Sequence, residues 1–86
     1  MTRFESAIFL LATKTKDAEE MDEIASKLEK RKSIVETSVV PGMKVKREEY
    51  DMMVRVIGSN RELDKVELML KNRSDFSKVA RLTAEK

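Results

Sequence analysis

Ile34–Ile57 decides the fold of this chain, and it reads IVETSVVPGMKVKREEYDMMVRVI. It opens with a run rich in β-branched residues, Ile34 to Val40, and closes with a second apolar run that begins at Tyr50. Runs of this kind are typical of β-strands, and Pro41-Gly42 is a strong signal for the end of the first one. We therefore expect a β-hairpin whose connection starts at Pro41-Gly42 and carries a charged stretch.

A helix pattern precedes this hairpin. After Asp17, apolar side chains recur at the three- and four-residue spacing of one buried helix face. Asp17 with Glu20 resembles a capping box, and the basic residues between Lys27 and Lys32 suit the end of a helix. The face that we expect to be buried consists of Ala18, Met21, Ile24, Ala25 and Leu28.

A second helix pattern follows the hairpin. Ser59 and Glu62 form another capping-box pattern directly after Gly58. The apolar face predicted for this helix consists of Leu63, Val66, Met69 and Leu70, and Phe76–Thr83 reads as a final strand. With a first strand over Phe4–Thr13, the predicted order is β-α-β-β-α-β.

This order predicts a single domain over residues 1–86. Two right-handed β-α-β crossovers with a hairpin between them give an α+β ferredoxin-like fold, a four-stranded antiparallel sheet with both helices on one face. The first and third strands are central in that arrangement. No linker or repeat divides the chain.

The first strand is apolar on both faces, although helices cover only one face of such a sheet. The other face needs a cover, so we predict a homodimer or higher homo-oligomer that forms face to face. We assign the interface to Ala7, Phe9 and Leu11, with the opposite face of the strand as the alternative. Met53 joins this assignment because Met52 and Met53 point to opposite faces. In the competing interpretation, the hairpin or tail of the same chain covers these residues.

Composition narrows the classes of function. The 18 basic and 16 acidic residues leave a net charge of only +2, which does not by itself indicate nucleic-acid binding. The chain has no cysteine and no histidine, so we expect no disulfide and no enzymatic activity. Glu48 and Glu49 beside Asp51 could bind a hard cation, but a strand directs neighbouring side chains to opposite faces, so we favour a solvated hairpin and expect no metal site. No cofactor motif is present, and no apolar stretch is long enough for a membrane span. We expect a cytoplasmic protein without membrane contact.

A basic cluster on the hairpin, Lys44, Lys46 and Arg47, is the candidate surface for nucleic acid. Phosphate is the ligand that such a cluster favours. Three charges on an exposed loop more often serve solubility, and aromatic residues for stacking on bases are scarce. Nucleic acid is therefore the less favoured partner.

Asp51 is the least expected residue of the hairpin. An acid within a central strand is usually exposed, paired or functional. We weigh a surface acid against an acid that contacts a ligand or a subunit interface, and the sequence leaves both open.

The segment from Val39 to Gly42, together with the Glu49-Tyr50-Asp51 run and the strand that follows it, resembles the effector-binding domain of the Lrp/AsnC transcription regulators. The resemblance covers Ala7–Thr83 and implies a stand-alone domain without a helix-turn-helix, dimers formed through the sheets, and an amino-acid effector. It implies ligand-binding roles for Tyr50, Asp51 and Thr83. The longer Met43–Glu48 hairpin is also similar to that of small YbeD-like ferredoxin-like proteins.

The expected function is therefore amino-acid sensing or oligomerisation by a non-enzymatic domain related to transcription regulation. The alternative is a ferredoxin-like adaptor that binds nucleic acid or protein through the basic hairpin.

Overall fold

The computed structural model describes residues 5–83, apart from the side chain of Thr83. Six elements follow one another: β1 (Glu5–Thr13), α1 (Ala18–Leu28), β2 (Ile34–Val45), β3 (Glu48–Gly58), α2 (Asn60–Asn72) and β4 (Phe76–Thr83). Phe4, the predicted start of the first strand, lies outside the described residues. No helix within residues 5–83 is long and apolar enough to cross a membrane.

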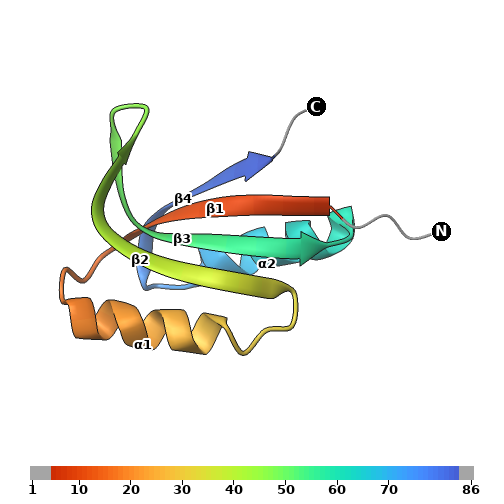
Figure 1. Cartoon of the computed structure of the whole chain (residues 1–86), viewed down its shortest axis with the longest axis horizontal. Helices are drawn as coiled ribbons and strands as arrows, with labels where there is room; N and C mark the ends of the chain where they lie inside the picture. Colours follow the sequence, from red (N-terminus) through yellow and green to blue (C-terminus); the bar gives the residue numbers. More distant parts are fainter. Residues whose placement is uncertain (1–4, 84–86) are drawn as a thin grey trace.

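The strands form one antiparallel sheet in the order β2-β3-β1-β4 (Figure 1). In the registers, Leu10 lies opposite Met53 on β3 and opposite Ala80 on β4. Both helices contribute to the core on one face of the sheet. The α+β ferredoxin-like fold and the central positions of β1 and β3 are thus confirmed.

The main core lies between the helices and one face of the sheet. Phe9 and Leu11 of β1 and Val54 of β3 are completely buried in it. The predicted helix faces supply the opposite side, except that Ala18, the first residue of α1, is exposed. The helix residues in this core are Ile24, Ala25, Leu28, Leu63, Val66 and Leu70.

The structure corrects the interface predicted at Ala7, Phe9 and Leu11. These residues are only 2%, 0% and 0% exposed and pack against the helices. The reason is the direction of β1, whose odd-numbered side chains point to the helix-covered face. A subunit could contact them only if the core opened, so the opposite face of β1 is the one that remains available.

The helix starts follow their predicted N-caps. The Asp17 side chain accepts a hydrogen bond from the Glu19 amide (3.0 Å), and the Ser59 hydroxyl accepts one from the Glu62 amide (3.2 Å). The reciprocal half of the first capping box is absent, because the carboxylate of Glu20 accepts instead from the Thr15 hydroxyl. Helix α1 also ends earlier than its basic residues suggested, with Glu29 as its C-cap.

The sequence suggested that β2 ends at Pro41-Gly42, and this prediction is wrong. The strand continues to Val45, and the pairing register shifts between Val39 and Met43, where β2 holds two more residues than β3. An edge strand tolerates proline at such an irregularity because its outer N–H needs no ladder partner. Gly42 adopts the left-handed conformation (φ 72°) that this bulge requires.

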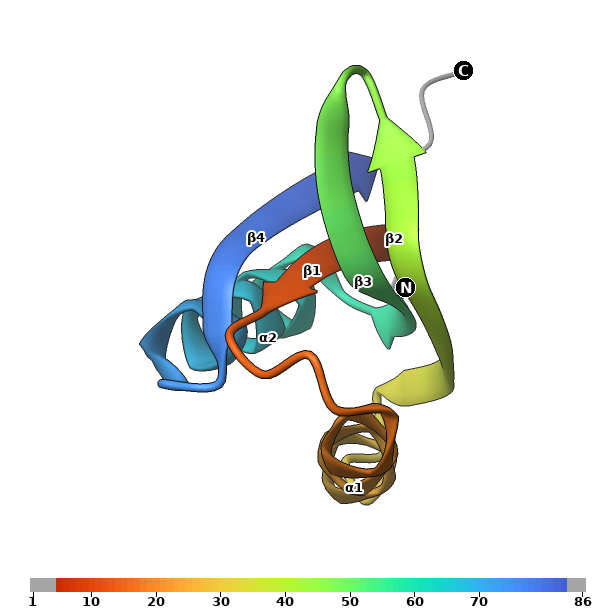
Figure 2. The ribbon, with the colours of Figure 1, turned by 90° about the vertical axis from the view of Figure 1, so that its left-hand side faces the viewer.

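The extended β2–β3 hairpin bends away from the helices and rises past the sheet (Figure 2). Its side chains Met43, Val45 and Tyr50 pack on Leu10 and Ala12, on the face of β1 that the helices leave free. Tyr50 thereby leaves the face predicted for it, which Met52, Val54 and Val56 share. The competing interpretation, in which the hairpin covers the free face, thus holds for this part of the sheet.

Candidate functional site

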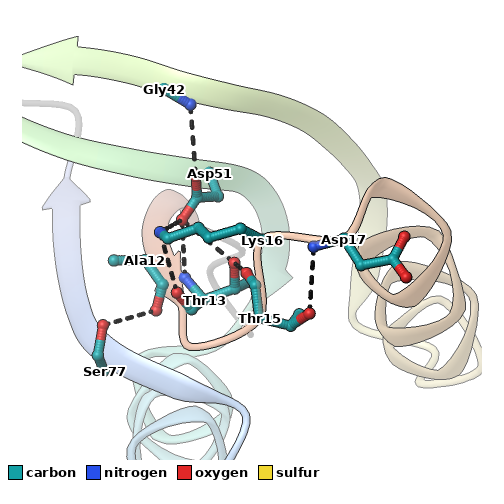
Figure 3. A network of polar contacts seen from close by, with 8 residues as sticks. All are labelled: Ala12, Thr13, Thr15, Lys16, Asp17, Gly42, Asp51 and Ser77. Atoms are coloured by element: carbon teal, nitrogen blue, oxygen red, sulfur yellow. Dashed lines mark hydrogen bonds and ion pairs between the residues drawn. The ribbon is translucent and has the colours of Figure 1, made fainter.

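Asp51 is the centre of a buried polar network, in the first half of β3. The residue is 2% exposed, and its carboxylate contacts three separate parts of the chain (Figure 3). Oδ2 accepts from the Thr13 amide (3.0 Å) and from Lys16 Nζ (3.0 Å), and Oδ1 accepts from the Gly42 amide (3.3 Å). Asp51 therefore ties the end of β1, the β1–α1 loop and the β2 bulge together.

Local backbone geometry brings the donors to this carboxylate. The register of β1 against β4 shifts between Ala12 and Thr13, at the end of the strand where the Thr13 amide turns to Asp51. At the bulge, a Cβ on Gly42 would meet no atom within 4 Å, so glycine is needed there for its left-handed backbone rather than for space.

Thr13 contributes a second contact through its hydroxyl. The oxygen lies 3.1 Å from Asp51 Oδ2 and 2.7 Å from the Thr15 carbonyl oxygen, and its single hydrogen can serve only one of them at a time. Because Thr13 is 1% exposed, its hydroxyl cannot reach a substrate from solution as a nucleophile. The arrangement is therefore suited to holding charge rather than to covalent chemistry.

Two opposing effects set the ionisation of Asp51. Burial alone would raise its pKa, but the hydrogen bonds from Lys16, from the Thr13 and Gly42 amides and from the Thr13 hydroxyl outweigh burial and hold the pKa below its ordinary value. Asp51 is thus an anion at neutral pH. It is not the exposed surface acid that the sequence allowed, because it is buried and paired. The other alternative, an acid that contacts a ligand or a subunit interface, stays a prediction.

The network includes a binding place for an ammonium group. Lys16 Nζ lies between Asp51 Oδ2 (3.0 Å) and the Thr13 carbonyl oxygen (3.2 Å). We call these two acceptors the ammonium cradle. The side chain of Lys16 is 67% exposed, whereas that of Asp51 is 3% exposed. Solvent therefore reaches the cradle from the side of the Lys16 side chain, whereas the Asp51 carboxylate is shielded by the protein.

Tyr50 and Thr83, the other predicted ligand residues, lie away from the cradle. Tyr50 is 4% exposed on the free face; its hydroxyl donates to Glu48 (3.2 Å) and Lys78 Nζ lies 5.2 Å from its ring centroid. Thr83 is paired with Ala7, six residues along β1 from Thr13, or about 20 Å at the rise of a strand. The side chain of Thr83 lies outside the described part. Within one chain, the backbone of Thr83 therefore lies far from the end of β1 that contacts Asp51.

The open face is the uncovered remainder of the sheet surface opposite the helices, and it is formed by Ile8, Met53, Ala80 and Leu82. Ile8, Met53 and Ala80 are partly buried, whereas Leu82 is 40% exposed. The hairpin shelters the adjoining Leu10, which is 3% exposed. Met53 thus lies on the face where a sheet-to-sheet contact would form.

The basic cluster is exposed at the end of the hairpin. Val45 pairs with Glu48, so Lys46 and Arg47 alone form the turn, and Lys44 precedes them on β2. The structure thus places these three predicted contacts together.

Surface grooves lie elsewhere. One of about 460 Å³ adjoins the start of α2 and includes Arg31 and Glu62, and one of about 370 Å³ adjoins the start of α1 and includes Lys14 and Glu23. Neither is lined by a predicted ligand residue. Within residues 5–83, no group of three acidic, cysteine or histidine side chains is placed to bind a metal ion.

Sequence reasoning missed most of the polar partners at this site. Lys16, Thr13 and Lys78 gave no signal, because single polar residues are common in loops, at strand ends and in edge strands. Gly42 did give a signal, but it was interpreted as the end of a strand. The bond between Lys78 and Glu48 (3.0 Å), which ties the hairpin to β4, was likewise unforeseen.

Comparison with known proteins extends the fold assignment. No family model matches the chain, and no curated protein matches it. The crystal structure of hypothetical protein PHS023 from Pyrococcus horikoshii is similar with a TM-score of 0.71 and 19% identity, over 98% of this chain and 92% of that one. The crystal structure of PH0061 is similar with a TM-score of 0.67 and 15% identity, over 96% of this chain. The present chain spans only 53% of the PH0061 chain. At these identities the likenesses establish a shared fold and nothing further.

Proposed function

We propose that this chain is a non-enzymatic assembly domain of the Lrp/AsnC effector type, which self-associates through the open face of its sheet. One observation carries the proposal: apolar side chains cover the face opposite the helices, and the hairpin of the same chain shelters only part of them. Apolar surface of this kind marks a contact site on small soluble domains.

The partner that fits this face is a second copy of the chain. Ile8 pairs with Leu82 on β4 and with Arg55 on β3, and Arg55 pairs in turn with Glu36 on β2. An exposed base, Arg55, and an exposed acid, Glu36, therefore border the apolar residues of the open face. A two-fold axis brings the same patch against itself, so Glu36 of one chain can meet Arg55 of the other. The apolar residues of the two open faces then contact each other, and opposite charges meet at the border of the interface.

The ammonium cradle supports a second part of the proposal, the binding of an amino-acid effector. Asp51 and the Thr13 carbonyl already hold one ammonium group, that of Lys16. The side chain of Lys16 is 67% exposed, so a ligand ammonium can approach the cradle from solvent along the path that the lysine now occupies. We propose that the ammonium of an amino acid replaces Lys16 there, next to the hairpin base.

Sedimentation velocity tests the assembly. We expect wild type to sediment at twice the 9.9 kDa mass of one chain, and Leu82→Glu to sediment as a monomer, because it places a charge on the open face. Leu68→Glu is the matched control, since Leu68 is 61% exposed on α2, away from this face. Wild type that stays monomeric at high concentration contradicts the proposal, as does equal dissociation of both variants.

Calorimetric titration with a panel of amino acids tests the effector. Lys16→Ala vacates the cradle and should bind the effector more tightly than wild type, whereas Asp51→Asn should lose most of the affinity because a charge-assisted hydrogen bond becomes a neutral one of about half the strength. In thermal shift, saturation at 100 Kd should stabilise wild type by about 2.7 kcal/mol. Equal affinities in wild type and both variants would remove the cradle from the proposal and leave the assembly standing.

A further inference from the structure

The tip of the β2–β3 hairpin is built from residues that its backbone disfavours. Lys46 and Arg47 have φ values of 51° and 72°, the left-handed region, and they alone connect Val45 to its partner Glu48. A two-residue turn with both residues left-handed strongly prefers Asn-Gly or Gly-Gly. Lysine and arginine are strained there because their Cβ atoms crowd the backbone. Strain of this kind indicates that the two side chains serve something other than the turn.

The charges at this tip are not used within the described part of the chain. Lys44 lies between Met43 and Val45, which pack inward, so strand alternation directs Lys44 outward. Lys44, Lys46 and Arg47 are all exposed, and none forms an ion pair with any described residue. We call these three residues the basic tip.

The neighbouring acids do not cancel this charge. Glu48 is held by Lys78 (3.0 Å) and by the Tyr50 hydroxyl (3.2 Å), on the side of the hairpin that faces β4. Those contacts hold the pKa of Glu48 below its ordinary value, first through Lys78 and then through Tyr50, and keep its charge engaged there. Glu48 and Glu49 are both exposed beside the tip, but Glu49, opposite Lys44, is the one of the two that forms no ion pair with a described residue. Three cations therefore face solvent against one unengaged carboxylate.

Shape places the basic tip where a large anion can reach it. The hairpin rises beyond the sheet, on the side away from α1 and α2 (Figure 2). The tip carries no apolar anchor, since Tyr50 is buried on the free face and packs with Lys78. Protein interfaces depend on such anchors, whereas contacts to a phosphate backbone need only positioned cations.

We propose that the basic tip binds the phosphate backbone of nucleic acid without reading its sequence. Each hairpin offers three phosphate contacts, which corresponds to a slope of about −2 to −3 in a plot of log affinity against log salt concentration. Affinity in this mode is about 10⁻⁴ to 10⁻⁶ M at physiological salt. No aromatic side chain stands at the tip for stacking on bases, so duplexes of different sequence should bind equally.

Fluorescence anisotropy with a labelled 20-base-pair duplex tests this proposal, over about 25 to 200 mM salt. The informative variant is Lys46→Asn with Arg47→Gly, because it removes two charges and installs the sequence that the turn prefers. We expect its affinity to fall at least tenfold at low salt while its Tm rises by at least about 4 °C. The double variant Lys30→Gln, Lys32→Gln is the control, since both lysines are exposed, lie outside the hairpin and form no ion pair with a described residue. It should keep wild-type affinity.

Four outcomes overturn the proposal. They are no binding by wild type at low salt, an equal loss in the control, a lower Tm in the Lys46→Asn, Arg47→Gly variant, and equal or tighter binding of a polyglutamate peptide of matched charge. The third would show that Lys46 and Arg47 hold the turn, and the last would indicate an acidic protein partner. The proposal does not depend on self-association, because each chain carries its own tip.

Discussion

The Asp51→Asn substitution should destabilise the fold, even though it leaves the size of the side chain unchanged. In the wild type, hydrogen-bond donors contact both carboxylate oxygens of Asp51. An asparagine has only one acceptor oxygen, and its NH₂ group would face the donors on the other side without accepting from them. Thr13 is 1% exposed, so water cannot replace a lost partner for its amide. An unsatisfied buried donor costs about 1 to 3 kcal/mol, and a hydrogen bond to a charged group contributes about 1.5 to 3 kcal/mol. We therefore expect a loss of about 2 to 4 kcal/mol in the free energy of unfolding.

Urea unfolding followed by circular dichroism measures this loss. At equal protein concentrations and pH 7, the midpoint for Asp51→Asn should fall while the slope with urea stays unchanged. Asp22→Asn is the control, because Asp22 is exposed on α1 and forms no ion pair with a described residue, and it should change stability by no more than about 0.5 kcal/mol. If the free energy of unfolding falls equally little in both variants, Asp51 does not hold the three segments together.

Further predictions concern acid stability and α2. Because the folded-state pKa of Asp51 is lowered, its stabilisation is present above about pH 4 and is lost as pH falls through the folded value, so urea midpoints of wild type and Asp51→Asn should converge in acid. Ser59→Ala removes the N-cap of α2 and should cost about 1 kcal/mol, measured by urea unfolding against Ser26→Ala, an exposed position of α1. Gly58→Ala places a Cβ 3.0 Å from Glu62 Cγ, so we expect a loss of about 1 to 3 kcal/mol; an unchanged melting temperature would show that Glu62 moves freely.

The order of the elements was predictable because it depends on local signals. Asp17 and Ser59 cap helices in any context that lets the helix form, and the apolar spacing after each residue defines the buried face. The assignment of Leu63, Val66 and Leu70 to the core followed directly from that spacing.

The position of the turn was not predictable from local signals. Pro41-Gly42 has the composition of a turn, but pairing with β3 continues past it, and only tertiary pairing shows that the dipeptide forms a bulge. Lys46-Arg47 has no turn composition at all, yet the register fixes it as the two-residue connection. Local propensity was overridden at both places by the pairing of the strands.

The two faces of β1 could not be distinguished from the sequence. Ala7, Phe9 and Leu11 are as apolar as Ile8, Leu10 and Ala12, so alternation identified two faces without showing which one the helices cover. The role of Asp51 was hidden for a similar reason, since its partners come from positions 13, 16 and 42. Contacts over such separations depend on the assembled sheet.

The central claim is that the open face joins two copies of the chain, and intermolecular nuclear Overhauser effects test it most directly. A sample that mixes ¹³C-labelled and unlabelled chains reports contacts between subunits alone. We predict that methyl groups of Ile8, Met53 and Leu82 show intermolecular effects while Leu68 on α2 shows none. A monomer without such effects, or effects confined to Leu68 and the helices, would contradict the claim.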